Sequence, residues 1–348
     1  MTTGGITVSN GMGCIVQAHG ADPGFFQTKH AHAGGKQILY PSLAGPTPVS
    51  LGQADLGKTD LLYRMLEPWP MLVGKYAYAQ KVGSPDIDAK WFQSDRYLAL
   101  LLAGLSDNSS FSLSYKLCLG LPIDHMSLRD ELQARISGTH TVLWDHIGSV
   151  QTIHIDAVVV AQGIGALATF VVDEDGNPTV PVDQLRNDEN AIRMACLDLG
   201  AGTSCAVSVR GLHVVTKETR SFALGAWNVE RQCREALIAT YGEGLVRGLG
   251  KHELLHVLRT NTLFDRGQHI DARAMFDAAC ASVARDIVAE CHALWGEART
   301  FQKFVMVGGG SILLGRHIRQ AWPHIETLPR PVFSNSEGYR RIAALALQ

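Results

Sequence analysis

A buried strand that ends in a glycine-rich turn is the feature that most constrains the fold of this chain. The stretch CLDLGAGTS runs from apolar residues through Asp198 into two glycines and two hydroxyl side chains. Glycines at alternate positions let a phosphate approach bare backbone, and a carboxylate beside them suits a hydrated Mg²⁺. The pattern predicts a strand, a phosphate-binding turn and a second strand, and a plain glycine-rich hairpin is the alternative.

An earlier stretch, ADPGFFQTK, has a similar character. It places Asp22, Gly24, Thr28 and Lys29 in one strand–turn–strand segment. Gly24 allows a tight turn that brings N–H groups near an anion, and Thr28 and Lys29 can donate to phosphate oxygens. Asp22 tolerates a phosphate only if a cation lies between them. An ordinary hairpin with a surface lysine would show the same residues.

A third turn lies near the C-terminus, in KFVMVGGGSILL. A strand, three glycines and a helix start make a surface on which a flat ligand such as a nucleoside can pack, because no side chains intervene. A plain tight turn is the alternative. The three turns lack the G-x-G-x-x-G pattern and the chain lacks G-x-x-x-x-G-K-[ST], which argues against a dinucleotide fold and a Walker-type NTPase.

Strands and helices alternate along the chain, which predicts an α/β protein. Its 348 residues, of which 46% are hydrophobic, suffice for two domains. Asp22 and Asp198 each end a strand and are followed by a glycine and a threonine, so the two halves echo each other. The echo suggests two related domains that face each other across a cleft.

Bulk properties narrow the function. A net charge of −2 provides no basic field for direct binding to nucleic acid. Seven scattered cysteines without a C-x-x-C pair suggest buried thiols in a reducing compartment. No signal peptide is visible, and the longest apolar runs are too short to span a bilayer. We therefore expect a cytoplasmic protein without a membrane partner.

Taken in order, these stretches resemble the actin-like ATPases shared by actin, heat-shock chaperones and sugar kinases. DPGFFQTK is similar to the first phosphate motif of that family, LDLGAGTS to the second, and GGGSILL to the adenosine motif. VVVAQGIGAL resembles the first connecting segment. The bacterial plasmid-segregation branch of the ParM/StbA type is closer still, through ILYPSLAG, YLALLLAGL, LCLGLP, LRTNTLFDRGQHID and FSNSEGYRRIA. The resemblance spans roughly residues 14–348.

The resemblance implies an α/β, actin-like fold in which two related RNase H-like domains face a nucleotide cleft. The first domain would cover residues 1–165, with a small insertion at about 45–90, and a C-terminal helix at 336–348 would return to it. The second would cover 166–335.

The resemblance also implies a site for ATP or ADP with Mg²⁺. Asp22 and Asp198 would hold the metal through water, and Gln162 and Asp198 would carry catalysis, with Gln162 aligning the attacking water. The remaining nucleotide contacts would come from the three turns: Gly24, Phe25, Gln27, Thr28 and Lys29; Gly200, Ala201, Gly202, Thr203 and Ser204; and Gly308, Gly309, Gly310 and Ser311.

The implied function is an ATPase that assembles into head-to-tail filaments for plasmid or DNA segregation, with a DNA-binding adaptor as partner and without sequence-specific DNA binding of its own. Phe26 stands where relatives usually carry a small residue, and Cys205 where an Asp is frequent. Both departures predict slow hydrolysis. A non-polymerising small-molecule kinase of the same superfamily is the alternative.

A remote alternative is a zinc peptidase, because HELLH at 252–256 matches H-E-x-x-H. His252 and His256 would be ligands and Glu253 the general base. Arg259 stands at the glycine position of the metzincin continuation, and no third ligand is apparent. We therefore interpret this motif as the face of a helix.

Overall fold

The structure is a computed structural model, and it divides into two compact units. Unit 1 comprises Met1–Asn190 and Val332–Gln348, and unit 2 comprises Ala191–Pro331. The structure describes residues 7–9, 15–47, 62–83, 91–106, 110–145, 147–186, 189–211 and 213–348. The division lies 25 residues beyond the sequence-based boundary at 165, because the segment after that position packs on the C-terminal helix of unit 1.

Among the described residues, unit 1 is built on a 10-stranded mixed sheet. In sheet order, its strands are β4 (Gln37–Pro41), β3 (Gln27–His32), β2 (Ile15–Pro23), β8 (Ser112–Leu121), β10 (Val150–Ala161), β9 (Gly138–Trp144), β6 (Leu62–Glu67), β7 (Met71–Gly74) and β5 (Ala44–Pro46), and β1 (Thr7–Ser9) pairs with β2. Strands β2, β8 and β10 are parallel, so their carboxyl ends lie at one edge of the sheet.

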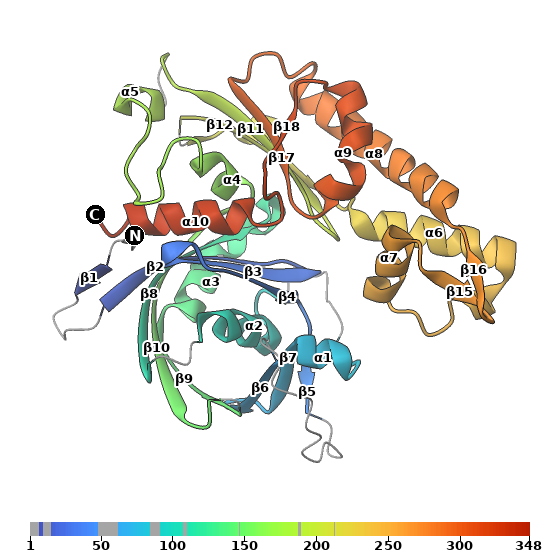
Figure 1. The fold of residues 1–348 in the computed structure, drawn as a ribbon. Helices are drawn as coiled ribbons and strands as arrows, with labels where there is room; N and C mark the ends of the chain where they lie inside the picture. Colours follow the sequence, from blue (N-terminus) through green and yellow to red (C-terminus); the bar gives the residue numbers. More distant parts are fainter. Residues whose placement is uncertain are drawn as a thin grey trace. The chain divides into compact units, whose positions relative to one another are not determined.

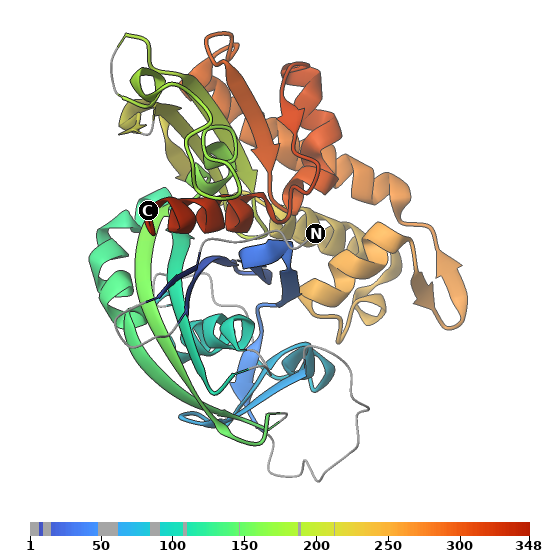
Figure 2. The ribbon, with the colours of Figure 1, turned by 60° about the vertical axis from the view of Figure 1, so that its left-hand side comes forward.

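The sheet curls around helix α2 (Asp95–Leu105), as Figures 1 and 2 show. Ser94 caps this helix, because its side chain accepts a hydrogen bond from the Tyr97 N–H at 3.1 Å. Every residue from Tyr97 to Leu105 is buried. A helix that is apolar on all sides needs such an enclosed position.

Helix α10 (Ser334–Leu345) covers β2 and β8 on the side away from α2 (Figure 1). Ala18, Cys118, Tyr339 and Ala343 form the buried cluster between them. The other helices of unit 1 are α1 (Lys75–Ala79), α3 (Arg129–Ile136), α4 (Ile164–Ala168) and α5 (Val182–Leu185), with 3₁₀ turns η1 (Ala33–Gly35) and η3 (Ile123–Leu128).

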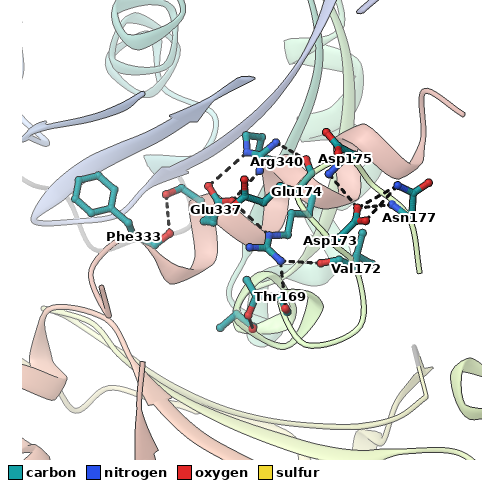
Figure 3. A network of polar contacts seen from close by, with 12 residues as sticks. Thr169, Val172, Asp173, Glu174, Asp175, Asn177, Phe333, Glu337 and Arg340 are labelled. Atoms are coloured by element: carbon teal, nitrogen blue, oxygen red, sulfur yellow. Dashed lines mark hydrogen bonds and ion pairs between the residues drawn. The ribbon is translucent and has the colours of Figure 1, made fainter. Parts of the chain in front are cut away.

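A polar network fastens the segment after α4 to α10, shown in Figure 3. Arg340 Nη1 donates to the Glu174 carbonyl at 2.8 Å, and Arg341 Nη1 donates to the Val172 carbonyl at 2.8 Å. Glu337 holds both guanidinium groups from within the helix. These bonds explain why residues 166–190 belong to unit 1.

The predicted insertion at 45–90 is described only in part. Strands β6 and β7 and helix α1 fall within it, and β6 joins the main sheet by pairing with β9. Residues 48–61 and 84–90 lie outside the described part of the chain.

Unit 2 has a sheet in the order β13 (His213–Val214), β12 (Ser204–Arg210), β11 (Arg193–Leu199), β17 (Lys303–Val307) and β18 (Glu326–Thr327), and β14 (Arg220–Phe222) pairs with β12. Its helices are α6 (Ala226–Tyr241), α7 (Lys251–Thr260), α8 (Arg273–Trp295) and α9 (Gly310–Ala321), with 3₁₀ turns η4 (Thr216–Glu218) and η5 (Glu243–Leu245). A separate hairpin joins β15 (Leu263–Asp265) and β16 (Gln268–Ile270). A core of aliphatic and aromatic side chains lies between the sheet and helices α6, α8 and α9.

The cysteines of the described chain fit the sequence-based expectation of buried thiols. Cys118, Cys196, Cys205, Cys233, Cys280 and Cys291 are buried, and none of them forms a disulfide bond within the described chain. Burial raises the pKa of Cys233 and of Cys280 to about 12, so both stay protonated and pack as small apolar groups. Of the helices in the described ranges, none combines the length and the apolar character that crossing a membrane requires.

Candidate phosphate-binding turns

The first turn joins β2 to β3 and places Asp22 directly opposite Lys29. Lys29 Nζ donates to Asp22 Oδ2 at 3.0 Å, and the two side chains are 13% and 11% exposed. The Gly24 N–H closes the turn on the Asp22 carbonyl at 2.9 Å. A Cβ at Gly24 would lie 3.1 Å from Lys29 Nζ, so glycine leaves room for the ammonium group. The turn thus brings a cation and an anion together at the edge of the sheet where β2 ends.

The remaining predicted residues of this turn differ in accessibility. Thr28 is fully buried, and its Oγ1 lies 2.9 Å from Ser42 Oγ. The Thr28 hydroxyl can keep this contact and also donate to a phosphate only if Ser42 is the donor in it. Phe25 is buried among aromatic side chains, while Gln27 and Phe26 are half-buried. Their predicted contacts with a nucleotide stay predictions.

Gln162 lies at the same sheet edge as Asp22. It follows β10 directly, and its N–H donates to the Leu121 carbonyl at 2.7 Å. Gly163 comes next with φ of 91°, a left-handed conformation that turns the chain into α4. Because β2 and β10 are both neighbours of β8, Gln162 and Asp22 are two strand spacings apart across the sheet, about 10 Å, and the register places Gln162 two residues further along the strands.

The second turn joins β11 to β12. Asp198 is the second-last residue of β11, is 3% exposed and pairs with Cys205 across the ladder. The Gly200 N–H donates to the Thr203 carbonyl at 2.9 Å, and a Cβ at Gly200 would lie 2.6 Å from that oxygen. The position therefore accepts glycine alone, and the turn is as tight as its sequence predicts.

The start of helix α6 holds the carbonyl groups of this turn. The Ala226 N–H donates to the Gly200 carbonyl at 3.2 Å, and the Trp227 N–H donates to the Ala201 carbonyl at 2.9 Å. These bonds direct the two carbonyl oxygens toward α6, so that they do not repel a phosphate bound at the turn. Ser204 is fully buried and donates to the Leu224 carbonyl at 2.8 Å, so its hydroxyl anchors the turn. Of the other predicted residues here, Gly202 is buried and Thr203 half-buried.

The third turn lies beside the second in unit 2, because β11 and β17 are parallel neighbours that end at one edge. Gly308 has φ of 81°, and a Cβ there would lie 2.5 Å from Asp198 Oδ1. Ser311 is buried and donates to the Gly308 carbonyl at 2.7 Å. Gly309 is exposed and Gly310 packs on the end of β11. Residue 308 therefore has to be glycine, because any side chain there would collide with the carboxylate of Asp198.

Asp198 lies in a row of polar side chains that the sequence did not reveal. Cys205 Sγ lies 3.4 Å from Ser221 Oγ, and Ser221 pairs with Cys205 across β12 and β14. Burial, and then the charges of Asp198 and Cys205, raise the pKa of the nearby Cys196 thiol. Ser221 is separated from the glycine turn by 17 residues, and its position depends on sheet register rather than on any local motif.

The donor set fits Mg²⁺ held through water better than a directly ligated transition metal. Within the described ranges, no three His, Cys, Asp or Glu side chains are grouped to bind a metal ion. Each of the first two turns instead offers one carboxylate, Asp22 or Asp198. Mg²⁺ usually keeps several waters and uses one or two carboxylates together with substrate phosphates.

The H-E-x-x-H segment forms helix α7, as predicted. Glu253 Oε2 accepts a hydrogen bond from the Gly250 N–H at 2.9 Å, which is the capping contact of this helix. Desolvation lowers the pKa of the half-buried His252 to about 4, and His256 is exposed. The described chain brings no third ligand to these histidines, so the geometry does not favour zinc.

Residues 20–165 match the family of actin-like proteins, N-terminal domain, and residues 196–320 match the archaeal actin homologue MreB-like family, C-terminal domain. No curated protein matches the sequence significantly.

Several solved structures share the fold. A ParM from a 15-stranded filament of Clostridium botulinum is 19% identical, with a TM-score of 0.77 over 94% of this chain and 99% of the other. The archaeal actin homologue Ta0583 is 18% identical, with a TM-score of 0.72 over 93% and 98%. A Bacillus thuringiensis ParM solved with ATP is 16% identical, with a TM-score of 0.67 over 95% and 99%.

Proposed function

Because this chain belongs to the actin-like proteins, we propose that it binds ATP or ADP together with Mg²⁺ and hydrolyses ATP. The observation that carries the proposal is the second turn, where a carboxylate that is 3% exposed adjoins two glycine turns at one sheet edge. Bare backbone and a buried carboxylate are the combination that a phosphate–Mg²⁺ pair requires.

Each residue has a definite role in the proposal. Asp198 and Asp22 accept hydrogen bonds from metal-bound water, and Lys29 and the turn amides contact phosphate oxygens. Gln162 orients the attacking water by its side-chain amide. Bound Mg²⁺ supplies charge neutralisation at the phosphates. Hydrolysis is expected to be slow, because the residue paired with Asp198 is Cys205. A thiol is a weaker hydrogen-bonding group than the carboxylate that is frequent at this position.

Two similar structures support the choice of ligand. The archaeal actin homologue Ta0583 was solved in complex with ADP, and the Bacillus thuringiensis ParM with ATP. We propose the same nucleotide class for this chain.

Substitution of Lys29 tests the proposal. Lys29→Met removes the cation that we assign to phosphate, so the Kd for ATP·Mg²⁺ in titration calorimetry should rise by roughly tenfold or more. The matched control is Lys116→Met, since Lys116 Nζ forms an ion pair of 2.6 Å with Asp156 on the central strands β8 and β10. Lys116→Met should leave the Kd unchanged. Equal effects of the two substitutions would contradict the role of the first turn.

We also propose that the protein assembles with copies of itself in a nucleotide-dependent manner. Support comes from its similarity to a ParM determined within a filament. A role in plasmid or DNA segregation, with a DNA-binding adaptor, is part of this proposal and rests on the resemblance of the sequence to the plasmid-segregation branch.

A further inference from the structure

An aromatic cluster adjoins the first turn and connects it to helix α2. The cluster comprises Phe25, Trp91, Phe92 and Tyr97. The ring of Phe25 lies 6.5 Å from that of Trp91 and 6.1 Å from that of Phe92, centroid to centroid. Tyr97 packs edge-on against the same two rings, at 5.9 and 5.7 Å. The tip of the turn is therefore in contact with the segment that begins α2.

Two polar atoms of this cluster are buried without an acceptor. Tyr97 and Trp91 are each 1% exposed. Neither Tyr97 Oη nor Trp91 Nε1 has a hydrogen-bond partner among the residues that the structure describes. Buried phenol and indole groups normally find a partner. Two such donors in one cluster point to an acceptor that a ligand supplies.

The position of Tyr97 relative to the first turn supports this reading. Burial, and after it the charge of Asp22, raise the pKa of Tyr97, so the phenol keeps its proton and remains a donor. The ring of Phe25, three residues after Asp22, connects the first turn to the aromatic cluster that contains Tyr97. Ser94 fixes the backbone of Tyr97 in the first turn of α2.

We propose that Tyr97 is a further binding residue of the first turn, and that its hydroxyl donates a hydrogen bond to a phosphate oxygen of the bound nucleotide. This inference rests on the proposed function. A phosphate oxygen is a charged acceptor, and charge-assisted hydrogen bonds are stronger than neutral ones. Trp91 Nε1 provides a second donor in the same cluster. The contact would also couple phosphate binding to α2, which the sheet of unit 1 encloses.

The test is Tyr97→Phe, which keeps the ring and removes only the hydroxyl. The Kd for ATP·Mg²⁺, measured by titration calorimetry, should rise by roughly tenfold. The unfolding temperature without nucleotide should not fall, because no bond within the described chain is lost. This combination of weaker binding and unchanged stability distinguishes a ligand contact from a structural one.

The matched control is Tyr115→Phe. Tyr115 is also buried, but its hydroxyl donates to the Leu105 carbonyl at 2.8 Å. Its removal should lower the unfolding temperature and leave the Kd for ATP·Mg²⁺ unchanged.

The possible results distinguish a failure of the role of Tyr97 from a failure of the proposed nucleotide binding. If the unmodified protein binds ATP·Mg²⁺ and Tyr97→Phe binds it equally well, the role of Tyr97 is overturned and the proposed function stands. The same holds if Tyr97→Phe loses stability as Tyr115→Phe does with no change in Kd. If the unmodified protein does not bind ATP·Mg²⁺ at all, the proposed function fails and the role of Tyr97 falls with it.

Discussion

His19 on β2 and His30 on β3 are buried, and their hydrogen bonds determine which ring nitrogens carry a proton. The Tyr40 hydroxyl donates to the Leu100 carbonyl, so the 3.0 Å contact between His30 Nε2 and Tyr40 Oη requires a proton on Nε2. His30 Nδ1 is then the acceptor for His19 Nε2, at 2.9 Å. The relay therefore requires a neutral His30, because its Nδ1 has to accept the hydrogen bond from His19.

This relay predicts that acid destabilises the protein. Burial, followed by the charges of His32, His30 and Arg340, lowers the pKa of His19; burial, and then His32, lowers that of His30. Below the ordinary pKa of about 6.5, the unfolded chain binds protons that the folded chain does not, so the free energy of unfolding falls as pH falls. Two such groups give a slope of up to about 2.7 kcal/mol per pH unit.

Urea unfolding between about pH 7.5 and about pH 5.5 measures this slope. His256→Gln is the control, since His256 is exposed on α7, and it should leave the slope unchanged. Stability that stays constant over this interval would show that the buried histidines titrate normally.

At the residue scale, the sequence was informative where chemistry is local. The tight turn that places Asp22 and Lys29 on neighbouring strands follows from the local sequence, although their ion pair was not predicted. The contact between Thr28 and Ser42 could not be predicted in this way. It depends on the pairing between β3 and β4 and on which face of the sheet is buried. The assignment of Thr28 and Ser204 as phosphate ligands through their hydroxyls stays a prediction for the same reason.

At the scale of elements, the attachment of the C-terminal helix α10 to unit 1 depends on the carboxylate of Glu337. Desolvation would raise the pKa of Glu337, but the hydrogen bonds and charges of Arg340 and Arg341 outweigh it and the pKa is lowered. Glu337→Gln leaves two largely buried guanidinium groups without their anion. The free energy of unfolding should fall by roughly 3 kcal/mol, and amide exchange should rise in residues 169–177.

Glu243→Gln is the matched control for this prediction. Glu243 and Arg247 are an exposed pair at 4.0 Å, at the same spacing along the chain as Glu337 and Arg341. Its loss should change the free energy of unfolding by less than about 0.5 kcal/mol. An equally small effect at Glu337 would mean that packing alone holds α10 in place.

Elements with a clear local signal were predictable. The strand–turn–strand segments at Gly24 and Gly200, and the strand followed by a helix at Gly308–Gly310, are confirmed. Where tertiary contacts decide, the sequence is a weaker guide. The extent of unit 1 beyond residue 165 is one example, because it depends on bonds between Arg341 and carbonyl groups about 170 positions earlier in the chain.

At the scale of the whole molecule, the predicted α/β, actin-like fold is confirmed by matches to an N-terminal and a C-terminal actin-type domain. Each motif alone is degenerate, but each glycine turn marks the end of a strand. The order of these turns along the chain was sufficient for the prediction. Filament formation is different in kind, because it depends on surfaces that contact a second copy and that carry no local motif.

The most direct test of the account is high-speed sedimentation of the purified protein with ATP·Mg²⁺, with ADP·Mg²⁺ and without nucleotide, followed by electron microscopy of the pellet. We predict that ATP·Mg²⁺ moves the protein into the pellet as filaments, and that its effect exceeds that of ADP·Mg²⁺. A protein that stays in the supernatant under all three conditions at every salt concentration would contradict the proposed nucleotide-dependent assembly.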